Sequence, residues 1–219
     1  MPTLPKHELM QGAHFAKQYV TDYLQSDLPD RILDYRNGWL LTDSELPLPA
    51  RYLSYEPVAL DKWPTIITVA LTTNNMERIG YATSQYSPEY RMSYNMRTYV
   101  WCRSSNSEET TLQRDRLTTV VRSALLDYPS LQATDTTRTF RAEIDESGMR
   151  EEFSDLTPLK GERFLAGAYL GYELSLDEVV MRKAYGHVDE DGVSFGVKNV
   201  GVEDTLTLAS TLAQGGASE

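Results

Sequence analysis

The sequence predicts an α+β protein: a mixed β-sheet flanked by an N-terminal helix and a second long helix, followed by a C-terminal extension. Three observations support this class: a helical apolar pattern near the N-terminus, a long run of strict alternation at residues 90–103, and a second helical pattern after it. The chain has 219 residues, of which 41% are hydrophobic, which suits one globular domain with extensions. We therefore divide it into an α/β domain, residues 1–183, and an extension, residues 184–219.

The first expected helix covers residues 7–25, where apolar side chains recur at steps of three and four: Leu9, Ala13, Ala16, Val20 and Tyr23. Residues 26–57 hold several prolines and Gly38, which predicts a connection of short turns with one brief strand at 51–55. Residues 65–71 are β-branched and apolar on both faces, which is typical of a central strand. Asn74 and Asn75 then suggest a turn.

Residues 90–103 alternate without a break between two faces. Tyr90, Met92, Tyr94, Met96, Thr98, Val100 and Cys102 share one face, and Arg91, Ser93, Asn95, Arg97, Tyr99, Trp101 and Arg103 share the other. At about 3.3 Å per residue these residues span about 45 Å. Such a strand is expected to project beyond its own domain.

Three further elements follow this strand. Ser105 and Glu108 form a capping-box pattern at the start of a helix of about twenty residues that Pro129 ends. Residues 139–145 alternate as a one-faced strand toward the edge of a sheet. Residues 163–176 form a closing strand whose second face carries small residues, which let another element approach closely.

Residues 184–219 differ in amino-acid composition from the rest of the chain. They hold six acidic groups, six glycines and a single basic residue, Lys198, and offer little apolar surface for a core. Val193, Phe195 and Val197 alternate as a short strand would. Two interpretations remain open: this segment pairs with a sheet edge on another protein, or it completes the chain's own sheet as a hairpin with residues 163–182.

Charge and composition exclude several functional classes. The chain has 21 basic and 32 acidic residues, a formal charge of −11, so we expect no general affinity for nucleic-acid backbones. No stretch reaches the roughly 18 apolar residues of a membrane helix, and the start lacks a secretory pattern. The single cysteine, Cys102, suits a reducing compartment.

We expect no catalytic, cofactor or metal site. His7, His14 and His187 are scattered, and residues 189–192 depart from the calcium-loop pattern because Lys198 stands at its glutamate position. Glu143, Asp145 and Glu146 are explained by solvent exposure, and Cys102 by burial as a small hydrophobic residue. Because many catalytic sites lack a motif, a cytoplasmic hydrolase is retained as a remote alternative.

One face of the long strand is suited to contacts with another protein. Arg97, Tyr99, Trp101 and Arg103 are of the types enriched in protein interfaces. The alternative is aromatic cross-strand packing inside the domain. We take these four residues, with Val193, Phe195 and Val197, as the candidate interface.

The order of elements resembles that of the tail terminator proteins of long-tailed bacteriophages. The resemblance covers roughly residues 7–182 and rests on these segments: the leading helix, Trp63–Val69, Tyr99–Arg103, the helix from Arg114 to Leu131 and the closing strand Phe164–Leu176. The extension and the insertion at residues 26–57 depart from that family's pattern.

The resemblance implies a virion structural protein without enzymatic activity. Such a subunit would form a ring, expected to be a hexamer, that caps the head-proximal end of the tail tube, stops its growth and joins the tail to a neck or head-completion protein. It would assemble in the host cytoplasm, and DNA would pass through the ring without specific binding. The alternative nearest to it is a head–tail connector, either an adaptor or a stopper.

Overall fold

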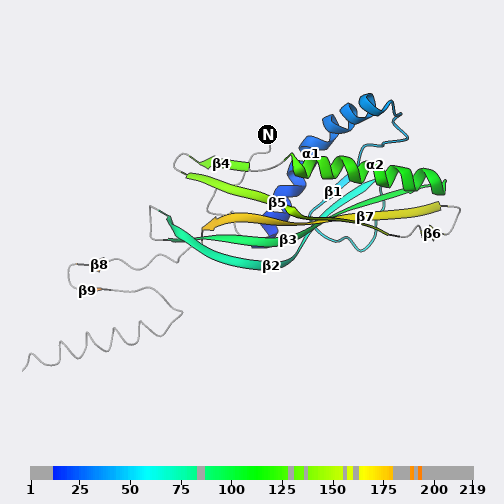
Figure 1. Cartoon of the computed structure of the whole chain (residues 1–219). Coiled ribbons are helices and arrows are strands. Elements are labelled where there is room, and N and C mark those ends of the chain that lie inside the picture. The colour runs from blue at the N-terminus through cyan, green and yellow to red at the C-terminus, as the bar shows by residue number, and fades with distance from the viewer. Residues whose placement is uncertain are drawn as a thin grey trace, which may run out of the picture. The chain divides into compact units, whose positions relative to one another are not determined.

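The computed structural model describes residues 12–82, 87–127, 131–135, 138–154, 157–159, 163–179, 188–189 and 192–193. The chain divides into two units, Met1–Val179 and Val180–Glu219. In the first unit, helices α1 (Gly12–Trp39) and α2 (Ser107–Leu126) lie on the same face of a β-sheet (Figure 1). The predicted α+β class, with two helices flanking a mixed sheet, is therefore confirmed.

The sheet has seven strands in the spatial order β1-β2-β3-β7-β5-β4, with β6 paired to β7. Only β1 and β2 are parallel, and every other pairing is antiparallel. The strands are β1 (Arg51–Leu53), β2 (Thr65–Ala82), β3 (Ser87–Ser104), β4 (Leu131–Asp135), β5 (Arg138–Phe153), β6 (Thr157–Leu159) and β7 (Arg163–Val179). The last of these, β7, lies between β3 and β5 at the centre of the sheet.

The predicted long strand is confirmed and is longer than expected, at 18 residues. It pairs along most of its length with β2 on one side and β7 on the other, so its side chains keep a strict period of two. On the left of Figure 1, β2 and β3 extend beyond both helices. The expected projection beyond the domain is wrong, because β3 stays paired with β2 and β7 of the same unit along its length.

The turn expected at Asn74 and Asn75 is wrong, because β2 continues through them to Ala82. The register of β2 against β3 shifts between Ala70 and Thr72 and again between Thr73 and Asn75. Each irregularity inserts an extra residue, which breaks the alternation that identifies a strand in a sequence. The polar residues of this half of β2 are exposed, so they resemble a loop.

The connection expected over residues 26–57 is wrong over residues 26–39, because α1 continues to Trp39 with Pro29 inside it. Leu24, Leu28 and Ile32 are buried one turn apart, so packing against the sheet outweighs the backbone hydrogen bond that Pro29 removes. Irregular chain begins only after Leu40, and the brief strand appears as β1.

The second helix is confirmed with 20 residues, but its cap is Asn106 rather than Ser105. The Asn106 carboxamide oxygen accepts hydrogen bonds from the backbone N–H groups of Glu108 and Glu109, at 2.9 and 3.2 Å. The predicted capping box at Ser105 and Glu108 therefore places the start of the helix correctly but names the wrong cap residue.

The core lies between the two helices and one face of the sheet. Helix α1 contributes Leu24, Leu28 and Ile32, helix α2 contributes Leu117, Val120 and Val121, and the sheet contributes Met96, Val100, Leu170, Tyr172, Leu174 and Leu176 among others. Burial of this continuous apolar layer is the main favourable contribution to folding. The opposite face of the sheet carries no helix among the described residues.

The strand predicted at residues 139–145 is present within the longer β5. Strand β4 pairs with β5 only as far as Ala142, so from Glu143 to Phe153 the outer side of β5 has no described partner strand. The predicted edge position is therefore confirmed for residues 143–145 and wrong for residues 139–142, which β4 covers.

In the second unit, β8 (Val188–Asp189) and β9 (Gly192–Val193) pair antiparallel in a separate two-stranded sheet. Val193 thus belongs to β9, whereas Phe195 and Val197 lie outside the described residues. Both sides of β7 are occupied by strands of the first unit, β3 on one side and β5 and β6 on the other.

Candidate functional site

The face of the sheet opposite α1 and α2 carries the predicted interface residues, and we call it the helix-free face. Trp101 of β3 lies opposite Thr65 of β2 and Gly167 of β7, and Tyr99 lies opposite Ile67 and Tyr169. Residues directly opposite in an antiparallel ladder share a face. Arg97, Tyr99, Trp101 and Arg103 are therefore neighbours along one side of β3, each of them half-buried.

The indole ring of Trp101 lies directly on Gly167 of the neighbouring strand. A Cβ atom built on Gly167 would come within 2.5 Å of Trp101 Cζ3. Only a glycine leaves room for this contact, so the close approach expected at the small residues of β7 is confirmed here. At Gly171 the nearest atom is Tyr169 Cε2 at 3.8 Å, an ordinary contact.

Tyr169 forms the centre of a second cluster on this face. The Arg97 guanidinium carbon lies 4.5 Å from the centroid of the Tyr169 ring, and the Tyr99 and Tyr169 ring centroids are 5.6 Å apart. A hydrogen bond with Tyr99 raises the pKa of Arg97. A hydrogen bond with Glu152 raises the pKa of Tyr169. The cluster therefore brings one guanidinium group and two aromatic rings together.

Arg103 lies at the end of the same row, with its guanidinium carbon 5.8 Å from the centroid of the Trp63 ring. The Nε atom of Arg103 and the Nε1 atom of Trp63 are both buried and have no hydrogen-bond partner among the described residues. Each of the four predicted interface residues thus has a contact inside the chain. Packing within the domain therefore buries part of the surface of these four residues.

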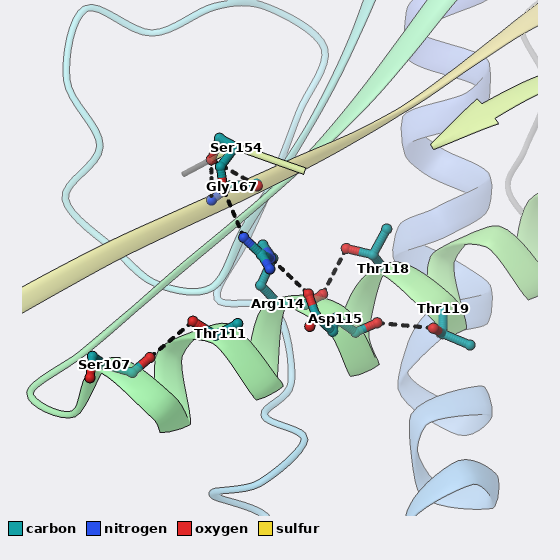
Figure 2. A network of polar contacts seen from close by, with 8 residues as sticks. All are labelled: Ser107, Thr111, Arg114, Asp115, Thr118, Thr119, Ser154 and Gly167. Carbon is teal, nitrogen blue, oxygen red and sulfur yellow. Dashed lines mark hydrogen bonds and ion pairs between the residues drawn. The ribbon is translucent and has the colours of Figure 1, made fainter. Parts of the chain in front are cut away.

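A polar network at the C-terminal end of β5 fixes the backbone on which Trp101 rests. Figure 2 shows Arg114 of α2 reaching toward Ser154 and Gly167. One Arg114 amino nitrogen donates to the Ser154 carbonyl oxygen at 2.8 Å, and Ser154 Oγ bonds both the N–H and the carbonyl oxygen of Gly167 at 3.0 and 2.9 Å. The Arg114 guanidinium also lies 5.0 Å from the centroid of the Phe153 ring. Sequence reasoning did not identify Arg114 or Ser154.

A polar cavity of about 190 Å³ opens on the helix-free face where β5 departs from its register with β7. Its lining includes Arg97 and Arg150 together with Asp145, Glu152 and Glu173. Charges of both signs therefore meet in one hollow, and the carboxylates outnumber the guanidinium groups. Such a lining suits polar side chains of another protein better than an apolar ligand.

Of Cys102 and the three histidines, the structure describes Cys102 and His14. Cys102 is fully buried, and this burial raises the pKa of its thiol to about 12, so it is not a thiolate near neutral pH. His14 is exposed on α1, and His7 and His187 lie outside the described residues. Among the residues that the structure describes, no group of three His, Cys, Asp or Glu side chains could hold a metal ion.

One of the three acidic candidates, Asp145, has a role that the structure explains. Asp145 accepts hydrogen bonds from the N–H and the hydroxyl of Ser147, and these bonds lower its pKa. Asp145 and Glu146 are exposed, as expected, and Glu143 is half-buried. Residues 190 and 191 of the expected acidic turn lie outside the described residues.

Glu178, which sequence reasoning missed, is a buried carboxyl group near the end of β7. It accepts a hydrogen bond from the Gly12 N–H, the first of α1, at 2.9 Å, and another from the Tyr94 hydroxyl. Burial raises the pKa of Glu178, and the two hydrogen bonds oppose that effect. Its position at a helix N-terminus explains why a carboxylate is tolerated there.

Neither α1 nor α2, the helices of the described residues, has the length and apolar character needed to cross a membrane. No protein-family model and no curated protein sequence matches this chain.

Proposed function

We propose that the chain is a virion structural protein similar to the tail terminators of long-tailed bacteriophages. It would form a ring on the head-proximal end of the tail tube, stop the growth of the tube and join the tail to the neck. The observation that carries the proposal is the order of elements: a leading helix, a long hairpin of β2 and β3, a second helix and a central closing strand. These are the elements on which the resemblance rests.

The helix-free face supports a role in assembly. It presents tyrosine, tryptophan and arginine side chains that are ordered by contacts within the chain before any partner binds. Side chains that are already ordered lose little conformational entropy on association. Arg97, Tyr99, Trp101 and Arg103 are therefore proposed to contact a neighbouring subunit, the tail tube protein or a neck protein.

The two lateral edges of the sheet also support a ring. The outer side of β2 pairs with β1 only over Thr65–Ile67, and the outer side of β5 has no described partner from Glu143 onward. These two exposed edges lie on opposite sides of one subunit. A closed ring needs two different surfaces on each subunit, one for each neighbour.

The charge of the chain is compatible with a channel for DNA. Six copies would carry six times −11, or −66. Like charges repel a polyanion, so DNA would pass such a ring without being held. We propose a structural rather than an enzymatic role, in the virion and, during assembly, in the host cytoplasm.

Deleting the gene from the phage that encodes the chain tests this function. Tails assembled without a terminator should have aberrant lengths, and expression of the wild-type chain should restore a uniform length. Normal tails on heads that lose their DNA would instead indicate the alternative, a connector of the neck. Normal virions would contradict both structural roles.

The variant Cys102→Ala distinguishes the structural role from the enzymatic alternative. Cys102→Ala removes the only thiol, so a tail protein that needs no thiol chemistry should still restore tail length in the deletion strain. Hydrolysis of a broad substrate panel by the wild-type chain, abolished by Cys102→Ala, would favour the remote enzymatic alternative.

A further inference from the structure

The polar cavity on the helix-free face has a glycine between two arginines. Arg97 of β3, Gly171 of β7 and Arg150 of β5 lie opposite one another across three neighbouring strands, and all three line the cavity. A Cβ atom on Gly171 would meet nothing closer than 3.8 Å, so the space over this glycine is open. Neighbouring strands are about 4.8 Å apart, which puts the two arginine backbones about 10 Å apart. Both long side chains can therefore reach one group that rests on Gly171.

Neither of these two guanidinium groups is bound to a carboxylate of the chain. Among the described residues, Arg97 and Arg150 form no ion pair. Arg97 lies on the Tyr169 ring and hydrogen-bonds with Tyr99, whereas Glu152 hydrogen-bonds with Tyr169. A guanidinium group has several N–H donors, so these contacts leave donors of both arginines unused. A carboxylate, which accepts paired hydrogen bonds from arginine, suits this place.

The next row of the cavity is acidic. Glu173 of β7 and Asp145 of β5 lie opposite each other, two residues along β7 from Gly171, which corresponds to about 7 Å. Asn74 Nδ2 donates to Glu173 Oε2 at 3.2 Å, and Ser147 Oγ donates to Asp145 Oδ1 at 2.6 Å. These neutral donors position the two carboxylates without removing their charge.

The acidic row also lines a second cavity, of about 570 Å³, which it shares with the first. Its other charged side chains are Glu143 and the exposed Glu146, and no cationic side chain is among the described residues that line it. Glu143 already has an interaction within the chain, so we assign a bound cation to Asp145, Glu146 and Glu173. The acidic end of the first cavity thus adjoins a space that can take a ligand's side chain.

The nearness of the two rows selects the charge of the ligand. Arginines and carboxylates about 7 Å apart act on the same bound molecule, so a ligand of one charge is attracted by one row and repelled by the other. A ligand with an anion at one end and a cation at the other is attracted by both rows. The first cavity, at about 190 Å³, is smaller than the roughly 300–1,000 Å³ of pockets for drug-sized molecules, which favours a small ligand.

We propose that this cavity binds a basic α-amino acid of the lysine type. The α-carboxylate would lie on Gly171 between the guanidinium groups of Arg97 and Arg150. The side-chain cation would extend past the acidic row toward Asp145 and Glu173. This inference goes beyond the proposed function and does not depend on it, because it concerns a small molecule bound by the free chain.

Three matched probes test the charges of the ligand in calorimetric titrations of the full chain at low salt. L-Lysine carries both ends, L-norleucine lacks the side-chain cation, and cadaverine lacks the α-carboxylate. L-Lysine should bind at least about tenfold more tightly than either of the other two, because each of them loses one set of charge-assisted hydrogen bonds. L-Lysine should also raise the melting temperature of the wild type, since it binds the folded state.

Three variants test the place of binding. Arg150→Gln removes an exposed arginine of the cavity and should weaken binding of L-lysine at least about tenfold. Glu173→Gln should weaken binding of L-lysine more than that of L-norleucine. Arg163→Gln is the matched control: it removes the same charge from an exposed arginine of β7 that does not line the cavity, and should leave both affinities unchanged.

Thermal unfolding of each variant verifies that it folds. No binding of L-lysine to the wild type, equal affinities for L-lysine and either of the other probes, or unchanged binding to Arg150→Gln would each overturn the proposal. Equal losses in Arg150→Gln and Arg163→Gln would overturn it as well, because they would indicate a general charge effect. None of these results bears on tail length, so the proposed terminator role fails or stands separately.

Discussion

The two faces of the central sheet are built from the same strands and differ in what they contact. On β7, Leu170, Tyr172 and Leu174 point into a core covered by α1 and α2, and each is almost completely buried. The intervening positions, Tyr169, Gly171 and Glu173, line a polar cavity on the helix-free face. Because successive side chains of a strand alternate, one segment of sequence serves both purposes.

The difference separates the origin of stability from the origin of contact specificity. The covered face excludes water over a continuous apolar layer, which stabilises the fold without selecting a partner. The helix-free face carries arginines, tyrosines and carboxylates, which we propose select a partner. Changes on the first face should therefore alter unfolding, and changes on the second should alter association.

The largest expected effect is on the covered face. Leu170→Ala removes a side chain that is 0% exposed, and a truncation of this kind costs about 2–5 kcal/mol of unfolding free energy. Tyr169→Ala, one residue away on the helix-free face, should cost clearly less, because the tyrosine is only half-buried. Chemical denaturation of the two variants measures the difference, and equal losses would contradict the division between faces.

An intermediate effect is expected at Gly167, where the helix-free face is packed tightly. Gly167→Ala places a Cβ within 2.5 Å of the Trp101 ring and should cost about 1–3 kcal/mol. Gly171→Ala, on the same strand and face, meets nothing closer than 3.8 Å and is the matched control.

A Trp101→Val background sharpens this prediction. With the indole removed, Gly167→Ala should cost much less, so the two changes should show a coupling energy in a double-mutant cycle followed by denaturation. Additive losses would mean that the indole does not constrain position 167.

The sequence predicts an element well where its pairing is regular. Residues 90–103 are recognised because β3 has neighbours on both sides and the extra residues of its pairing with β2 all lie on β2, so β3 keeps a period of two. The second half of β2 was missed because its bulges break that period, and the second half of α1 was missed because Pro29 suggested an end to the helix. In both places tertiary packing and pairing outweigh the local signal.

The candidate site shows the same limit. Residue types and the alternation of residues 90–103 together predict Arg97, Tyr99, Trp101 and Arg103 as neighbours on one face. The contact of Trp101 with Gly167 could not be predicted, since it depends on the register between strands far apart in the sequence. The network of Arg114 and Ser154 depends on the same long-range placement.

A smaller effect, of opposite sign, is expected at the end of α1. Leu40 is 89% exposed and has a φ of +56°, a left-handed conformation that a leucine adopts at a cost. Leu40→Gly should stabilise the protein by up to about 1 kcal/mol, because glycine adopts this conformation readily. A melting temperature lower than that of the wild type would show that the exposed leucine makes a stabilising contact.

The smallest effect concerns pH and the buried carboxyl group of the covered face. Burial raises the pKa of Glu178, so in the folded state the proton is held to a higher pH than in the unfolded state. Stability from this group is greatest below the ordinary glutamate pKa and is lost as pH rises through the raised pKa. Thermal melts of the wild type and of Glu178→Gln measure this effect. As pH rises from acid toward neutral, the melting temperature of the wild type should fall relative to that of the variant. A difference that grows in the other direction would mean that the hydrogen bonds from Gly12 and Tyr94 outweigh burial.

The central claim, that this chain forms a ring at the head-proximal end of a phage tail, is tested most directly by electron microscopy of tails carrying a labelled copy of the chain. The account predicts the label only at the head-proximal end, on a ring with six-fold symmetry, and on tails of uniform length. Label along the tube, at the distal tip or absent from the particle would contradict it.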